Sequence, residues 1–363
     1  MIIALTQIVC ERCFNDTYQM FIRRMFFLHK HKYFPIIKCM TKKTFALILS
    51  FILCLNIKLN ATNNTSAHWS FDLTSDFVYY PLVEFVPGSS HFAPISGALD
   101  TLAFRFTGNA NYYIPLNLGS HWIYDDSNLI FQSTLELTPV TFKAQESIFF
   151  NPYPFLELQT GVSAAIGWNF GNVLNLYGFN QNTLEYEELS TFKNMYYEWF
   201  IKTTIMFDLG YVIPGDWTHV IFLTDYKIYY ARLTGIKPKE VYFWQTTPGL
   251  TNGWQFDYRL ILGYQFPKYV YRTGIILLFN GHFDPKDYGQ YTESYYGRFK
   301  KISISPFVQL KLSENDMLSF LIEISSRRSF SQAHTKLTEE ILLDYSGREW
   351  FFNMFGISWE KRF

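Results

Sequence analysis

Histidine and carboxylate side chains are the groups in this chain that could carry acid–base or metal chemistry. In the segment Asn280-Gly281-His282-Phe283-Asp284, a histidine and a carboxylate stand two residues apart, and this pair could bind a metal ion. No His-Glu-x-x-His motif, no Gly-x-Ser-x-Gly motif and no phosphate-binding glycine loop occurs in the sequence. We therefore interpret His282 and Asp284 as part of a solvated loop, and we predict no catalytic residue, no metal site and no cofactor.

A larger set of charged residues recurs with a period of two, opposite apolar side chains. Within Trp254–Phe266, for example, Asp257 and Arg259 alternate with Phe256 and Tyr258. Such alternation is typical of a strand whose two faces meet different environments. If the apolar faces meet lipid, the charged faces line a barrel lumen, where they could guide a small polar solute or only stiffen the wall. This interpretation predicts the following lining residues: Arg105, Glu136, Glu157, Lys202, Asp208, Asp257, Arg259, Arg272, Lys301, Lys311, Glu323 and Arg327.

The signs of these charges are balanced once Asp72 and Asp76, which share the pattern, are included. A wide pore for ions of one sign would show a bias, so the balance predicts a lumen crossed by salt bridges. The whole chain is balanced too, with 31 basic and 31 acidic residues, which argues against a nucleic-acid partner. Charged residues make up only 17% of the chain and aromatic residues 20%. Soluble proteins contain about 25% charged residues.

The elements that would position these residues are long strands. Alternation and turn residues predict twelve strands, over the ranges 69–80, 97–107, 110–118, 128–142, 155–170, 197–212, 217–233, 254–266, 269–281, 297–312, 316–330 and 349–363. Tight turns are expected at Gly108-Asn109, Pro214-Gly215-Asp216, Pro267-Lys268 and Ser313–Asp316, and an intermediate connection at Lys143–Pro154. A soluble sandwich is the alternative, but its strands average about five or six residues. The pattern therefore predicts an all-β, antiparallel up-and-down barrel with alternating short and long connections.

The C-terminal stretch Trp350–Phe363 carries the most specific signal. One of its faces bears Phe351, Phe355, Ile357, Trp359 and Phe363, and the other bears Gly356, Ser358, Glu360 and Arg362. This ending resembles the last strand of bacterial outer-membrane β-barrel proteins, whose terminal aromatic residue is read by the assembly machinery. The resemblance implies a transmembrane barrel over residues 69–363, with short periplasmic turns and longer outer loops. It also implies that Phe355, Trp359 and Phe363 form the assembly signal, and that the partners are outer-membrane lipid and the outer-membrane assembly machinery.

For such a monomeric barrel, the expected function is a narrow, porin-like channel for passive diffusion of small polar solutes. The alternative is a non-conducting surface barrel that acts as an adhesin or a structural protein. Exposed aromatic residues in the long segment Gly171–Met195 could contact a partner surface, or could fold into the lumen. An outer-membrane hydrolase is a third alternative, but the sequence has no Gly-x-Ser-x-Gly and no His-Glu-x-x-His motif to support it.

The N-terminal region reads as a secretory signal. Residues 40–61 have a basic start at Lys42 and Lys43 and an apolar run from Phe45 to Ile57, which is typical of a signal peptide. We therefore predict that residues 1–39 are a mis-annotated extension and that residues 62–68 form a short linker. All four cysteines, Cys10, Cys13, Cys39 and Cys54, precede the expected cleavage site, and Cys54 could be lipidated.

Overall fold

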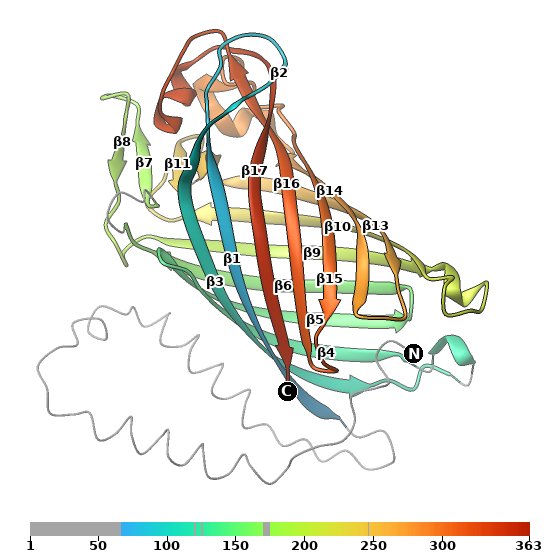
Figure 1. Cartoon of the computed structure of the whole chain (residues 1–363). Coiled ribbons are helices and arrows are strands. Elements are labelled where there is room, and N and C mark those ends of the chain that lie inside the picture. The colour runs from blue at the N-terminus through green and yellow to red at the C-terminus, as the bar shows by residue number, and fades with distance from the viewer. Residues whose placement is uncertain (1–66, 120, 125, 170–174, 246) are drawn as a thin grey trace, which may run out of the picture. The chain divides into compact units, whose positions relative to one another are not determined.

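The computed structural model describes residues 67–363, apart from 120, 125, 170–174 and 246 (Figure 1). The expected N-terminal extension, the signal peptide, all four cysteines and nearly all of the expected linker lie outside these described residues. None of the described helices is long and apolar enough to cross a membrane.

Twelve antiparallel strands form a closed barrel. Each strand pairs with the next along the chain, and β1 pairs with β17 from Asp72–Arg362 to Tyr79–Phe355, which closes the sheet. Closure removes the unpaired edges that would otherwise expose backbone polar groups. The all-β, twelve-stranded prediction is confirmed. The barrel strands are β1 (His68–Val83), β3 (Ile95–Pro115), β4 (Asn128–Leu137), β5 (Thr141–Tyr153), β6 (Leu156–Gly167), β9 (Met195–Asp208), β10 (Val220–Leu233), β13 (Gly253–Gln265), β14 (Val270–His282), β15 (Lys301–Lys311), β16 (Asp316–Phe330) and β17 (Tyr345–Arg362).

Two strand boundaries differ from the prediction. The expected turn at Gly108-Asn109 lies in the middle of β3, so two predicted strands are one. The reason is that this pair has ordinary strand partners, and the side-chain oxygen of Asn109 accepts a hydrogen bond from Thr134 Oγ1 at 2.8 Å across to β4. The expected connection at Lys143–Pro154 is instead mostly strand β5. One merged strand and one additional strand leave the predicted total unchanged.

The turn that separates β4 from β5 lies at residues 138–140. The hydroxyl of Thr138 accepts hydrogen bonds from the backbone N–H groups of Val140 and Thr141, at 3.3 and 2.9 Å. A threonine hydroxyl used in this way, followed by a proline, ends a strand because the backbone donors are satisfied locally. This short turn lies at the barrel end that also carries the long connections, which we call the loop end. The other end, the turn end, carries residues 116–127, 154–155, 209–219, 266–269 and 312–315.

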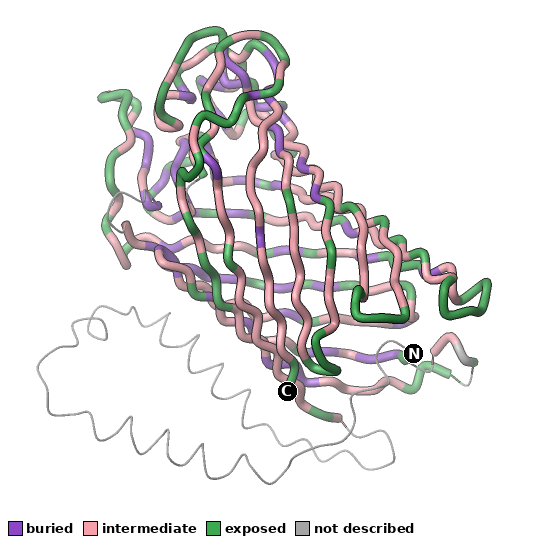
Figure 2. Tube along the Cα trace, viewed as in Figure 1, coloured by how far each residue is buried: buried purple, intermediate pink, exposed green. Residues whose placement is uncertain are grey.

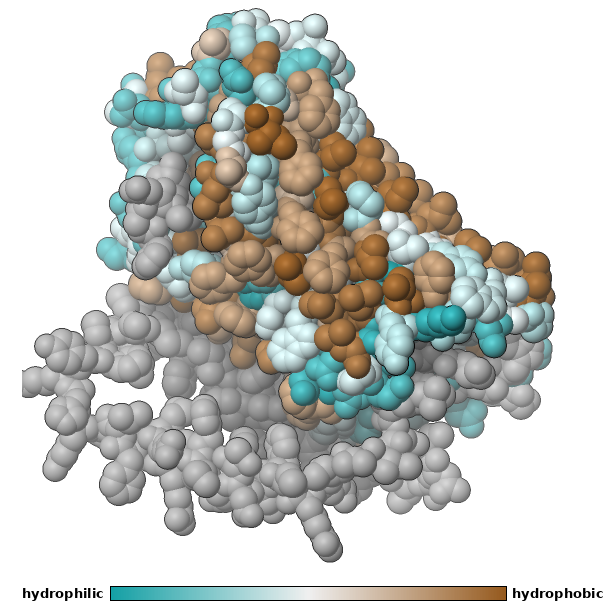
Figure 3. Space-filling view, in the orientation of Figure 1, coloured by the Kyte–Doolittle hydropathy of each residue, from teal (hydrophilic) through white to brown (hydrophobic). Residues whose placement is uncertain are grey.

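The outward face of the barrel wall is apolar. Outward side chains such as Phe77, Phe104, Ile201 and Leu262 are 45–58% exposed. Hydrophobic residues gather over the visible wall in Figure 3, and most wall residues in Figure 2 are only partly buried. Exposed apolar side chains around a closed barrel are expected where the surrounding medium is lipid.

At the loop end, several connections fold together into what we call the loop cap. Strands β7 (Tyr177–Asn180), β8 (Glu185–Glu188), β11 (Val241–Trp244) and β12 (Thr247–Thr251) form a second small sheet. Next to it lie β2 (His91–Phe92) and the 3-10 helices η4 (Pro285–Tyr291) and η5 (Leu337–Leu342); η2 (Trp122–Tyr124) and η3 (Leu209–Tyr211) lie at the turn end. Side chains from four connections and from the end of β16 make one buried cluster: Phe179, Val241, Tyr288, Tyr291, Tyr295, Phe330 and Ile341. The partly buried Tyr186 and Leu343 pack against it.

Candidate functional site: the charged inner wall

The strand register divides the wall residues between two faces. Directly opposed residues of neighbouring strands point to the same side of a sheet. Asp76 lies opposite Arg105, whereas their chain neighbours Phe77 and Phe104 lie opposite each other and are exposed on the outward face. Following the register around the barrel puts one set of residues on the inner face with Asp76: Arg105, Glu136, Glu157, Lys202, Asp208, Asp257, Arg259, Arg272, Lys301, Lys311, Glu323 and Arg327.

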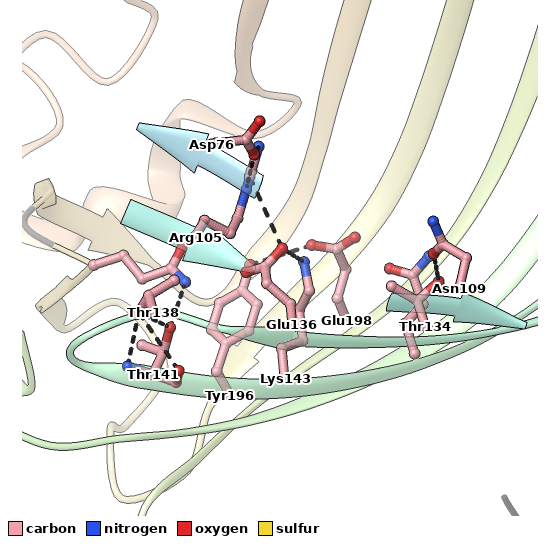
Figure 4. A network of polar contacts seen from close by, with 12 residues as sticks. Asp76, Arg105, Asn109, Thr134, Glu136, Thr138, Thr141, Lys143, Tyr196 and Glu198 are labelled. Atoms are coloured by element: carbon pink, nitrogen blue, oxygen red, sulfur yellow. Dashed lines mark hydrogen bonds and ion pairs between the residues drawn. The ribbon is translucent and has the colours of Figure 1, made fainter. Parts of the chain in front are cut away.

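The first chain of inner charges runs across four neighbouring strands, β1, β3, β4 and β5 (Figure 4). Arg105 Nη2 lies 2.7 Å from Asp76 Oδ2, and Arg105 Nη1 lies 3.9 Å from Glu136 Oε2. Lys143 Nζ lies 3.2 Å from the same Glu136 oxygen. Four charges of alternating sign therefore follow one another along the wall.

The second chain of inner charges lies on β6, β9, β10 and β13. Lys202 Nζ is 3.8 Å from Glu157 Oε1, and Arg259 Nη2 is 2.5 Å from Asp225 Oδ2. Lys227 Nζ is 2.5 Å from Glu198 Oε1 and lies directly opposite Asp257 in the register. Lys202 and Lys227 lie directly opposite each other, and each pairs with a carboxylate elsewhere on a neighbouring strand. We call the two chains together the charge ladder.

Every ion pair between described barrel strands joins strands that are neighbours in the sheet. The sequence suggested a lumen crossed by salt bridges, and this expectation is wrong for the described residues. In each of these pairs the two charges stand on neighbouring strands, so the counterion lies beside its partner on the wall. A partner across the barrel would require a longer reach and would cost more side-chain entropy.

The remaining predicted residues lie nearer the ends of the strands. Toward the turn end, Asp208 Oδ2 lies 2.8 Å from His219 Nδ1, and Lys311 Nζ lies 2.8 Å from Glu314 Oε2. Arg272 Nε donates to Gln265 Oε1 at 3.0 Å. These contacts fasten strand ends to their turns, so these residues lie apart from the charge ladder.

Three predicted residues lie nearer the loop end. Glu323 accepts a hydrogen bond from Asn353 Nδ2 at 2.7 Å, and Arg327 pairs with Glu349. Glu349 also lies 2.9 Å from His91 Nε2, so this group ties β16 and β17 to the segment that carries β2. Lys301 has no ion pair and no side-chain hydrogen bond among the described residues.

Some charged residues of the inner face were not among the predicted lining residues. Asp225 and Lys227 stand two residues apart in a predicted strand, and the parity rule applied there would have found them. Lys143 was missed because its segment was interpreted as a connection. Glu198 shares the parity of Lys202 and was overlooked on the same strand.

A bulge in β17 explains a further difference. Glu323 lies opposite Met354 but the next residue, Ile324, lies opposite Phe352, so Asn353 is an extra residue in β17. One extra residue reverses the side-chain alternation beyond it. Phe351, expected on the apolar face, therefore points inward, where the Arg327 guanidinium lies 4.8 Å from its ring centroid.

The expected assembly signal lies on the last strand. Phe355 and Trp359 lie opposite Tyr79 and Ser75 on the outward face. Phe363 follows the end of β17; its backbone N–H donates to the carbonyl oxygen of Phe71 at 2.8 Å, and the residue is 67% exposed. Its recognition by assembly machinery stays a prediction.

The interpretation of His282 as a solvated residue is wrong. His282 ends β14 and is 5% exposed; its Nδ1 lies 3.2 Å from Asp287 Oδ2 and its ring packs against Tyr288. Asp284 instead caps η4 by accepting the N–H of Lys286 at 2.9 Å. No group of three potential metal ligands occurs among the described residues.

Comparison with known proteins finds likeness in structure only. No protein-family model and no curated protein matches the sequence. An outer membrane channel from Pseudomonas putida F1 has a TM-score of 0.43 and 8% identity, with 85% of this chain and 100% of that chain covered. The outer membrane channel DcaP of Acinetobacter baumannii has a TM-score of 0.36 and 7% identity, covering 84% and 100%. Pseudomonas putida OprB has a TM-score of 0.30 and 7% identity, covering 82% and 94%. TM-scores this low support no conclusion about function. The barrel itself is established by the closed pairing of its strands.

Proposed function

We propose that this protein is a narrow channel of the bacterial outer membrane through which small polar solutes diffuse passively. The observation that carries the proposal is the charge ladder: charged side chains line the inner face, and the ion pairs among them run along the wall rather than across it. An apolar outward face and a polar inward face are the pattern of barrels that enclose an aqueous path.

The location in the outer membrane is part of this proposal. A closed antiparallel barrel satisfies all backbone groups of its strands without water, as the interior of a membrane requires. The apolar outward wall and the aromatic last strand support the same location.

The presence of both signs in the ladder favours weak selectivity between cations and anions. A ring of one sign would concentrate one kind of ion, whereas paired charges of both signs largely cancel beyond a few ångströms. The pathway should therefore accept neutral and zwitterionic solutes as well as small ions.

Reversal potentials in a planar bilayer with a KCl gradient test this proposal. We expect a reversal potential near zero for the wild type and a shift toward cation preference for Arg259→Gln, which leaves Asp225 unneutralised. Lys361→Gln is the matched control, because Lys361 lies opposite Leu73 on the outward face and should leave the potential unchanged. An equal effect of both substitutions would show that Arg259 does not face the conducting path.

A second candidate function is a non-conducting surface barrel that acts as an adhesin or structural protein. The observation that favours it is the loop cap, because connections from most of the barrel rim pack into two buried clusters. A folded barrel that shows no conductance would support this second candidate function.

A further inference from the structure

The inner wall carries an apolar strip as well as charges. On β13 and β14, Ile261 lies directly opposite Ile276, and Leu278 follows on the same face. On β15 and β16, Phe307 lies directly opposite Leu321. All five side chains share the inner parity of Arg259 and Glu323, and all are partly exposed rather than buried. We call these five residues the apolar lane.

In the apolar lane, Gly274 leaves room for the aromatic ring of Phe307. Phe307 lies opposite Gly274, where a Cβ atom would come within 3.0 Å of the Phe307 ring and 2.4 Å of the Leu262 carbonyl oxygen. A side chain at Gly274 would therefore displace the ring or the backbone. With glycine there, the ring lies close against the wall and one face of it stays available to a solute.

A polar lane lies on the opposite side of the barrel. The inner face of β3 to β6 carries amide and hydroxyl side chains that bond to one another: Gln132 Nε2 donates to Asn111 Oδ1 at 2.8 Å, and Gln145 Nε2 donates to Ser147 Oγ at 3.1 Å. Gln159 continues this face on β6. In the closed strand order, five strands separate β15 from β5 in either direction, so the two lanes lie on opposite arcs of the wall.

From these two lanes we infer that the channel takes amphipathic solutes, small molecules with an apolar body and a charged or hydrogen-bonding head. The inference rests on the proposed channel function and narrows its class of solute. A uniformly polar solute would gain nothing from the apolar lane, and a purely apolar one would have to strip water from the amide and charged side chains. A molecule with both parts satisfies both arcs, with its body against Phe307 and its head toward the polar lane.

The test compares two anions with the same head group in single-channel recordings from the refolded barrel. Benzenesulfonate carries an aromatic ring, methanesulfonate does not, and neither takes up a proton near neutral pH. We expect benzenesulfonate to interrupt the KCl current, each interruption marking the residence of one molecule, and methanesulfonate to leave the current uninterrupted.

Two lane variants, Phe307→Gln and Leu321→Gln, locate the interaction. Each should shorten the benzenesulfonate residence, Phe307→Gln by roughly fivefold, since one aromatic contact contributes about 1 kcal/mol. Ile322→Val is the matched control, because Ile322 follows Leu321 but points outward and should leave the residence unchanged. Heat-dependent gel mobility verifies that each variant is folded, and the comparison of the two anions on the wild type needs no variant.

The possible failures are distinguishable. KCl conductance with the same response to both anions would overturn the amphipathic inference and leave the channel proposal standing. An unchanged residence time of benzenesulfonate in both lane variants would also overturn the amphipathic inference, because the anion would then bind elsewhere. Folded barrel without KCl conductance would overturn the channel proposal, and the inference with it.

Discussion

At the scale of single residues, the charge ladder joins well-buried carboxylates to partly exposed cations. Asp225 is 5% exposed, whereas the side chain of its partner Arg259 is 41% exposed. Glu136 is likewise 7% exposed and lies between two cations. Exposed pairs contribute little to stability, but a buried carboxylate that loses its partner keeps the cost of its lost hydration. The carboxylates should therefore make the wall sensitive to loss of the cations.

This asymmetry predicts a coupling between Arg259 and Asp225. Arg259→Gln should lower the free energy of unfolding by on the order of 1 kcal/mol, because Asp225 is left charged and poorly hydrated. Adding Asp225→Asn to that variant should restore most of the loss. Urea unfolding of the refolded barrel, followed by tryptophan fluorescence, measures both changes. Additive losses in the double variant would contradict the coupling.

The loop cap should respond to alkaline pH. Burial raises the pKa of Tyr186 well above the usual tyrosine value of 10.0, and its hydroxyl accepts the N–H of Gly249 at 3.3 Å. A raised folded-state pKa means that this stabilisation is complete below the unfolded-state pKa and is lost as pH rises toward the folded-state pKa. The cap should therefore loosen only above about pH 10.

Limited proteolysis across a pH series measures this loosening. Cleavage in the connection between β6 and β9 should rise at alkaline pH in the wild type and rise less in Tyr186→Phe, which removes the ionisable hydroxyl. Cleavage that increases equally in both would show that Tyr186 does not control the cap.

At the scale of elements, the bulge in β17 determines which side chains face inward at the loop end. Deleting Asn353 would remove the extra residue and leave regular pairing, in which Glu349 still lies opposite Arg327. The deletion and Asn353→Ala both lose the hydrogen bond from Asn353 to Glu323. We therefore expect the deletion to give a yield of folded barrel close to that of Asn353→Ala. A much lower yield for the deletion would mean that the barrel requires the bulge itself.

The end of β17 leads to a prediction about assembly. Deleting Phe363 should reduce the amount of barrel in the outer membrane, because the terminal aromatic residue is the expected recognition element. Removing the β7–β8 tip at residues 181–184, on an exposed hairpin, should reduce it less. Surface labelling of cells that produce each variant compares the two. Equal levels would contradict the recognition role of Phe363.

The sequence predicts the features of these strands that depend on residues close together in the chain. It does not predict the features that depend on pairing with other strands. Period-two alternation reports the environment of each strand locally, and it was enough for twelve strands and for the inner position of residues such as Asp257 and Arg259. It failed at Gly108-Asn109, because a turn-like dipeptide becomes strand when its neighbours in β1 and β4 supply partners. It failed again at Phe351, because the bulge at Asn353 is defined by pairing with β16.

The candidate site was less predictable than the fold. Alternation indicated which charges share a face, but the choice between pairs along the wall and pairs across the lumen depends on which strands are neighbours. The apolar lane escaped notice because Ile276 and Leu278 stand in a segment with apolar residues on both faces, and only the register separates them. The loop cap depends on contacts between segments far apart in the chain, such as Phe179 with Tyr291.

At the scale of the whole molecule, the barrel combines three surfaces with different chemistry. The outward wall is apolar, the inner wall carries the charge ladder and the two lanes, and the loop end bears an ordered cap. The first surface supports the proposed membrane location, and the second supports the proposed passage of solutes. Whether the loop cap leaves the inner path open decides between the two candidate functions.

Single-channel recording of the refolded barrel, residues 62–363, in a planar bilayer tests the central claim directly. The same sample is first run on a denaturing gel with and without heating, which reports whether the barrel is folded. We expect heat-dependent mobility together with discrete, uniform conductance steps in KCl. Heat-dependent mobility with no conductance steps would contradict the channel and would decide for a barrel closed by its cap.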